Sequence, residues 1–91
     1  MRTQLILSAV AVLILVAVRA RFEWLLAVVA LLALALAAEL VNAAIEALLD
    51  RLHPGYDGEI GAAKDMSSAA VLVVNTAAGA AFIVALAMSI A

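Results

Sequence analysis

Residues 22–49 read FEWLLAVVALLALALAAELVNAAIEALL, a run that contains neither glycine nor proline. As an α-helix its 28 residues rise about 42 Å, more than the hydrocarbon core of about 30 Å requires. Near its start, Trp24 is typical of the aromatic belt at a membrane interface. The opposite end carries carboxylates, so we expect it to emerge from the bilayer on the other side.

The composition of the chain supports a membrane protein. Of its 91 residues, 70% are hydrophobic and 13% are charged, against about 45–50% and about 25% in soluble domains. The length allows one domain, residues 1–91. The absence of cysteine excludes disulfides and thiolate sites. Four aromatic residues and no basic block predict no nucleic-acid partner.

Two further apolar runs predict an all-α membrane protein with three transmembrane helices. Residues 5–18 rise about 21 Å and can span if the flanking arginines snorkel outward. The alternative for this run is the hydrophobic region of a signal peptide. Residues 62–90 are rich in small residues, which let membrane helices approach closely. Residues 50–61 hold the single proline among several glycines and are expected to form a loop.

The distribution of basic residues predicts the orientation of these spans. The side that contains the N-terminus and the 50–61 loop carries Arg2, Arg51 and Lys64, and the other side carries Arg19 and Arg21. Because basic residues favour the cytoplasmic side, we expect the 50–61 loop in the cytoplasm.

A polar stripe marks the end of the second run. At about 100° per residue, its four members lie within roughly 80° of arc: Glu39, Asn42, Glu46 and Asp50. A carboxylate facing lipid costs about 2.5–3.5 kcal/mol, so the stripe should face protein, water or a cation. One alternative is a structural polar seam between helices. Another is an ion-translocation subunit, but residues 25–38 contain no polar side chain that would continue the stripe.

A second polar face opens the third run. On it lie Lys64, Ser67, Ser68 and Asn75, with Asp65 about 100° away from Lys64. A lysine at a helix start is disfavoured by the dipole, so we expect an anionic partner. The alternative for the two serines is a structural role, in which their hydroxyls donate to backbone carbonyls at a helix-packing surface. Phosphoryl transfer needs three kinds of group: carboxylates that bind Mg²⁺, a lysine that binds phosphate, and a carboxylate that accepts a proton. Together, the two polar faces contain residues of these kinds.

Two motifs resemble a known family. They read ELVNAAIEALLD at 39–50 and AKDMSSAAVL at 63–72. They are similar to the pattern E-x-x-N-[ST]-A-I-E-x-x-x-D followed by A-K-D-x-[GS]-[SA]-A-A in the small prokaryotic integral-membrane diacylglycerol kinases. The resemblance covers residues 37–72, and Ala43 departs from the usual Ser or Thr. Undecaprenol kinases of Gram-positive bacteria share the motif and are the close alternative.

The resemblance implies an activity and an assembly. It implies Mg²⁺-dependent transfer of the ATP γ-phosphate to the primary hydroxyl of diacylglycerol, which gives phosphatidic acid. It also implies a homotrimer with active sites shared between protomers, in the bacterial inner membrane, with the site facing the cytoplasm.

The resemblance further implies roles for individual residues. Glu39 resembles the general base and Glu46 the metal-binding carboxylate. Asn42 resembles a polar neighbour on the substrate side that positions these two groups. Asp50 falls at the mouth of the nucleotide site. Ser68 resembles a residue on the substrate side. The remaining expected nucleotide contacts are Gly55, Tyr56, Asp57, Lys64 and Asp65, with Glu46 contacting the nucleotide through the metal.

One departure concerns the N-terminus. The family carries an amphipathic surface helix ahead of the first span, with a further acidic metal ligand. This sequence begins at Met1, almost inside the first apolar run, so we expect no counterpart of that helix. The alternative function is therefore an inactive homologue that only assembles in the membrane.

Overall fold

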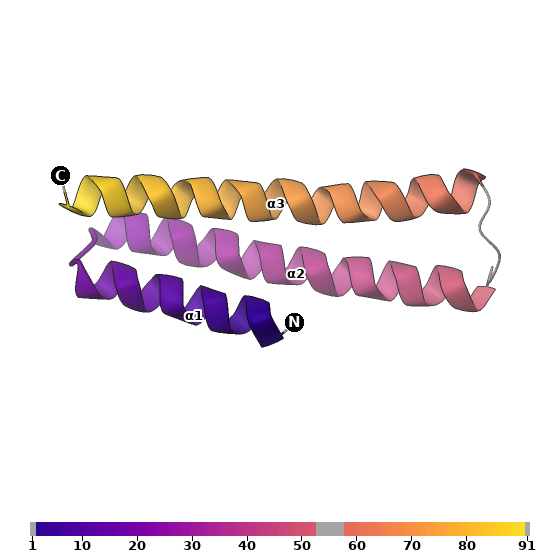
Figure 1. Ribbon diagram of the computed structural model, residues 1–91, viewed down its shortest axis with the longest axis horizontal. Helices are drawn as coiled ribbons and strands as arrows, with labels where there is room; N and C mark the ends of the chain where they lie inside the picture. Colours follow the sequence, from indigo (N-terminus) through magenta and orange to yellow (C-terminus); the bar gives the residue numbers. More distant parts are fainter. Residues whose placement is uncertain (1, 53–57, 91) are drawn as a thin grey trace.

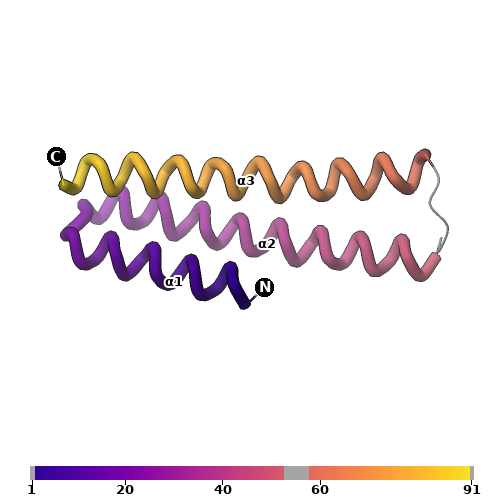
Figure 2. Tube along the Cα trace, in the orientation of Figure 1, coloured from indigo at the N-terminus to yellow at the C-terminus, as the bar shows by residue number. Residues whose placement is uncertain are grey.

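Three helices make up the computed structural model, which describes residues 2–52 and 58–90. They are α1 (Arg2–Ala17), α2 (Phe22–Leu52) and α3 (Gly58–Ile90). Figure 1 shows α2 and α3 antiparallel and side by side along the long axis, in a molecule of 51 × 20 × 16 Å. In Figure 2, α1 lies along the first half of α2, and the N-terminus falls near the middle of the long axis.

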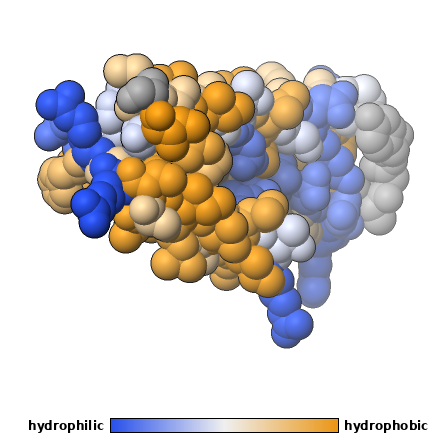
Figure 3. Space-filling view, turned by 60° about the vertical axis from the view of Figure 1, so that its left-hand side comes forward, coloured by the Kyte–Doolittle hydropathy of each residue, from blue (hydrophilic) through white to orange (hydrophobic). Residues whose placement is uncertain are grey.

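The two long helices account for the hydropathy of the chain. Both α2 and α3 are long and apolar enough to cross a membrane, whereas α1 has 16 residues and is shorter than such a span. In each long helix only 11% of the most apolar window is buried within the chain, unlike a core helix of a soluble protein. Figure 3 shows apolar residues over the middle of one face and hydrophilic residues at its two sides. The protein is therefore an all-helical membrane protein.

The long helices extend further than the sequence predicted. Helix α2 continues to Leu52 and α3 begins at Gly58, so both enter the 50–61 stretch that we expected to be a loop. Arg51 lies in the last turn of α2 and Glu59 in the first turn of α3, and both charges complement the helix dipole. These charges favour the helical conformation at both ends of a stretch in which the proline and glycines predicted a loop. The predicted nucleotide contacts Gly55, Tyr56 and Asp57 lie outside the described residues.

A capped turn joins α1 to α2. Arg19 has a φ of 59°, in the left-handed region that favours glycine. The backbone N–H of Ala20 donates to the Leu15 carbonyl at 2.9 Å, and that of Arg19 donates to the Val16 carbonyl at 3.1 Å. These two bonds form a Schellman motif, which satisfies the last carbonyls of α1 and reverses the chain.

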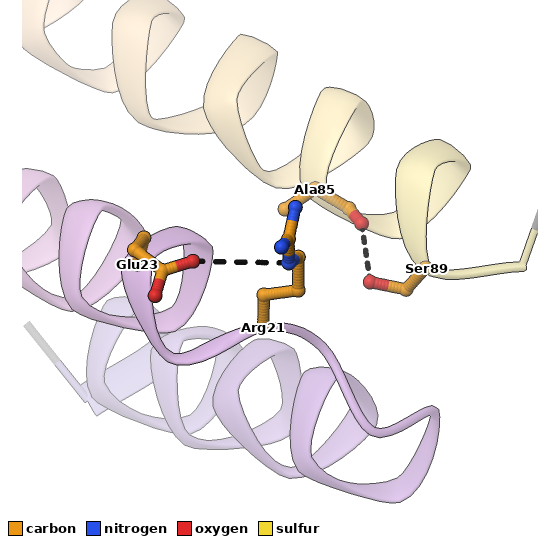
Figure 4. Close-up of polar contacts among 4 residues, drawn as sticks. All are labelled: Arg21, Glu23, Ala85 and Ser89. Atoms are coloured by element: carbon orange, nitrogen blue, oxygen red, sulfur yellow. Dashed lines mark hydrogen bonds and ion pairs between the residues drawn. The ribbon is translucent and has the colours of Figure 1, made fainter.

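The same end of the molecule carries charged side chains at its surface (Figure 4). Arg21 Nε lies 3.9 Å from Glu23 Oε2, and both side chains are exposed. Nearby on α3, the Ser89 hydroxyl donates to the carbonyl of Ala85 at 2.6 Å. The hydroxyl is thus satisfied within its own helix, and the exposed charges lie next to the α1–α2 turn.

The core between the helices is narrow. Its fully buried residues are Leu15, Val28, Ala35 and Ala85, with Ala78 nearly so. Leu15, Val28 and Ala85 form one cluster, against which Trp24 and Phe82 pack, among others. Because alanines supply most of the buried contact, the helix backbones approach closely.

This close approach predicts the effect of a larger side chain. Ala35 is fully buried, so Ala35→Leu should lower the free energy of unfolding in detergent by about 1–3 kcal/mol. Ala27→Leu is the matched control, because Ala27 is exposed on the same helix and should leave stability unchanged. Equal stability of the two variants in chemical unfolding would contradict the packing described above.

Candidate functional site

The polar stripe of α2 begins where the hydrocarbon core ends. A core of about 30 Å corresponds to about 20 helical residues. Counted from Phe22 beside the charged turn, it ends close to Glu39. Asp50 lies about 16 Å further along the axis. By this count the expected membrane edge falls close to Glu39, and the rest of the stripe leads outward from it.

A cleft of about 410 Å³ opens between the three helices at this level. Its polar lining comes from Thr3, Gln4 and Ser8 of α1, Glu39 of α2 and Asn75 of α3. The rest of the lining is leucine, alanine, glycine and phenylalanine. Glu39 is half-buried and is the single charged residue among those that line the cleft. The cleft thus combines an apolar wall with one carboxylate.

Gln4 meets this carboxylate from α1. With its amide nitrogen turned toward Glu39, Gln4 donates to Oε2 at 2.5 Å and also to Oε1. This orientation satisfies both groups, because a carboxylate only accepts and an amide nitrogen only donates. Sequence reasoning missed Gln4. The sequence feature that could have indicated it is a polar amide directly before the first apolar run, near the expected membrane edge.

Asn42 lies one turn outward and faces α3. The Ser67 hydroxyl donates to Asn42 Oδ1 at 2.5 Å, and both side chains are half-buried. Asn75, further along α3, donates from Nδ2 to the Val71 carbonyl of its own helix at 2.9 Å. The polar faces predicted on the second and third helices therefore meet through Asn42 and Ser67.

The Asn42–Ser67 bond predicts a measurable coupling between α2 and α3. In a double-mutant cycle of Asn42→Ala and Ser67→Ala, the coupling in unfolding free energy should be about 0.6–1.7 kcal/mol. A cycle of Asn42→Ala with Ser68→Ala is the control, because Ser68 is exposed and should show coupling near zero. Equal coupling in both cycles would contradict the bond.

Lys64 has an anionic partner, as predicted, but Lys64 itself lies in the second turn of α3 and not at the helix start, because α3 begins at Gly58. Its ammonium donates to Asp50 Oδ1 and forms an ion pair that joins the outer ends of α2 and α3. The Lys64 side chain is 26% exposed. In the second turn of α3, the Lys64 ammonium can interact with phosphate oxygens as a point charge.

Glu46 is the carboxylate that the sequence predicted to bind metal. It is half-buried and lies on the same face of α2, one turn from Asn42 and one turn from Asp50. Within residues 2–52 and 58–90, no group of three or more acidic or histidine side chains is arranged to hold a metal ion. Mg²⁺ usually takes one or two protein carboxylates and completes its shell with water and substrate phosphates. Glu46 alone would be within the number of carboxylates that such a site uses.

Two predicted site residues lie at the surface of the chain. Asp65 and Ser68 are both exposed, whereas their neighbours Lys64 and Ser67 make the contacts with α2. The helix face that meets α2 is thus rotated from Ser68 toward Ser67.

Comparison with known proteins gives a family for this arrangement. The family model for prokaryotic diacylglycerol kinase matches residues 1–90, a range that includes all three helices. No curated protein and no solved structure gives a match. The resemblance predicted from the two sequence motifs is confirmed. The chain belongs to the prokaryotic diacylglycerol kinase family, a family of membrane lipid kinases.

Proposed function

We propose that the protein is a lipid kinase that transfers the γ-phosphate of ATP to the primary hydroxyl of diacylglycerol and forms phosphatidic acid. One observation carries this proposal. Glu39 is the single charge in a largely apolar three-helix cleft at the edge of the hydrocarbon core. The hydroxyl of a membrane diacylglycerol lies at the same depth, with its acyl chains in the apolar region.

The proposed reaction assigns the proton to Glu39. The carboxylate accepts the proton of the lipid hydroxyl, whose oxygen forms a bond to the γ-phosphorus. The bond between that phosphorus and the β–γ bridging oxygen breaks, and ADP leaves with the bridging oxygen. A carboxylate in hydrogen-bond reach of the hydroxyl is suited to this step as a general base.

The outer residues of the site would hold the nucleotide. Lys64 would contact the phosphates, and Asp50 orients Lys64 through their ion pair. Glu46 would bind Mg²⁺ together with the ATP phosphates, and the ion would supply neutralisation of their charge. Asp65, Ser68 and the segment Gly55–Asp57 remain predicted contacts with the nucleotide and substrate.

The proposal extends to assembly and location. We propose a homotrimer in the bacterial inner membrane, with the outer end of α2 and α3 in the cytoplasm. The many large apolar side chains exposed on the single chain, such as Leu34, Leu72 and Ile83, are available to lipid and to other copies of the chain. The partial exposure of the Lys64 side chain supports its contact with ATP.

A panel of lipid alcohols tests the proposal. Purified protein in mixed micelles would receive radiolabelled ATP, Mg²⁺ and either diacylglycerol or undecaprenol. Labelled phosphatidic acid is expected, and it should disappear when Mg²⁺ is chelated. Labelling of undecaprenol alone would assign the other lipid substrate. The absence of transfer to any lipid alcohol would overturn the proposed kinase.

A further inference from the structure

The structure places an amide against the proposed general base. We infer that Gln4 is a positioning residue that fixes the Glu39 carboxylate for proton transfer. This inference rests on the proposed function and adds a residue of α1 to it. Gln4 acts on the reaction through Glu39 and need not touch the substrate.

The contact is specific to the two carboxylate oxygens. With its amide nitrogen turned toward Glu39, Gln4 donates to Oε2 at 2.5 Å and also to Oε1, so it contacts both oxygens of the carboxylate. Both residues are half-buried, and both line the cleft between the helices. A substrate hydroxyl that entered the cleft would therefore meet a carboxylate that Gln4 already contacts.

No other lining residue duplicates this role. Thr3, Ser8 and Asn75 are the remaining polar residues of the cleft, and none of them is charged. Asn75 already donates from its amide to the Val71 carbonyl. No acidic, basic or histidine side chain of α1 or α3 lines the cleft with Glu39. Gln4 is thus the residue best placed to restrict rotation of the Glu39 side chain.

A fixed carboxylate has a direct catalytic advantage. A long, half-buried glutamate samples several rotamers when it has no partner. An error of about 1 Å in the position of a reacting group can cost about a hundredfold in rate. Loss of Gln4 should therefore lower kcat and leave the binding of ATP unchanged, because the nucleotide contacts lie further out on α2 and α3.

The test uses two variants of similar size. Gln4→Met keeps the length of the side chain and removes the donor. Gln4→Glu keeps its shape and places a second carboxylate beside Glu39, where like charges repel. Ile6→Ala is the control, because Ile6 is 62% exposed on the same helix and lines no part of the cleft. The measurements are kcat, KM for ATP, KM for diacylglycerol and the thermal unfolding of each variant.

We expect Gln4→Met to lower kcat by roughly 10-fold to 100-fold with KM for ATP within twofold of the wild type. Gln4→Glu should lower kcat at least as much, although it fills the same volume. A role in packing alone predicts the reverse order, with the isosteric Glu variant closer to wild type.

The outcomes separate the inference from the proposed function. If wild-type protein phosphorylates diacylglycerol and both Gln4 variants keep kcat within twofold of Ile6→Ala, the inference is overturned and the kinase stands. If wild-type protein transfers no phosphate to any lipid, the proposed function itself fails. If the Met variant does not fold, the isosteric Glu variant decides, and wild-type kcat in that variant overturns the inference.

Discussion

Glu39→Gln is expected to lower the turnover of lipid phosphorylation by at least about a hundredfold, within the range of about 10²–10⁴ that a general base contributes. The substitution keeps the size of the side chain and keeps an oxygen that can accept the bond from Gln4. It removes the basic carboxylate from the cleft. Turnover is measured as labelled phosphatidic acid formed per protein at saturating ATP and lipid, and thermal unfolding is followed in the same detergent.

The control for this prediction is Glu23→Gln. Glu23 lies at the opposite end of α2, where its exposed pair with Arg21 spans 3.9 Å and contributes little to stability. The same chemical change there should leave turnover unchanged. Turnover of Glu39→Gln within twofold of the wild type would remove Glu39 from the reaction.

Lys64→Met should lower kcat/KM for ATP by about a hundredfold, which corresponds to about 2.7 kcal/mol. The reason is loss of charge-assisted hydrogen bonds to phosphate, each of which contributes about 1.5–3 kcal/mol. Stability should fall by no more than about 1 kcal/mol, because the Asp50 side chain of the pair is 63% exposed. Initial rates across an ATP titration, with a parallel unfolding experiment, measure both quantities.

Arg51→Met is the control for Lys64→Met. Arg51 is an exposed basic residue in the last turn of α2, at the same end of the molecule. Its loss should change kcat/KM for ATP by less than about threefold, the range of a weak surface electrostatic effect. An equal loss in the two variants would indicate general attraction of ATP by positive charge and would contradict a phosphate contact by Lys64.

The helices and their facing surfaces were predictable because both follow from periodicity. The apolar run from Phe22 has no helix breaker, and the cost of carboxylates in lipid requires its polar stripe to face something else. An anionic partner for Lys64 was predicted from a helix start expected near residue 62; Asp50 is that partner, although α3 begins earlier, at Gly58. These predictions depend on local sequence and elementary electrostatics, which is why they transfer to the structure.

The contact between Gln4 and Glu39 could not be predicted in the same way. The contact depends on the position of α1 along the axis of α2 and on the angle between the two helices. A helical wheel gives neither of these quantities. The turn itself contradicts local preference, because Arg19 occupies a backbone conformation in which glycine is favoured. Whether Ser67 or Ser68 faces α2 likewise depends on a rotation of α3 about its own axis. That rotation is smaller than the angle between adjacent residues of a helix.

The turn at Arg19 also limits which changes of chain length the protein can accept. Each residue added between Val18 and Arg21 would turn α1 by about 100° relative to α2 if it joined the helix. Gln4, some four turns away, would then point at lipid, and Glu39 would lose its partner although every residue of the site was still present. Insertions and deletions in this short connection are therefore more damaging than most substitutions in it, since a substitution changes one side chain and a length change shifts the phase of an entire helix.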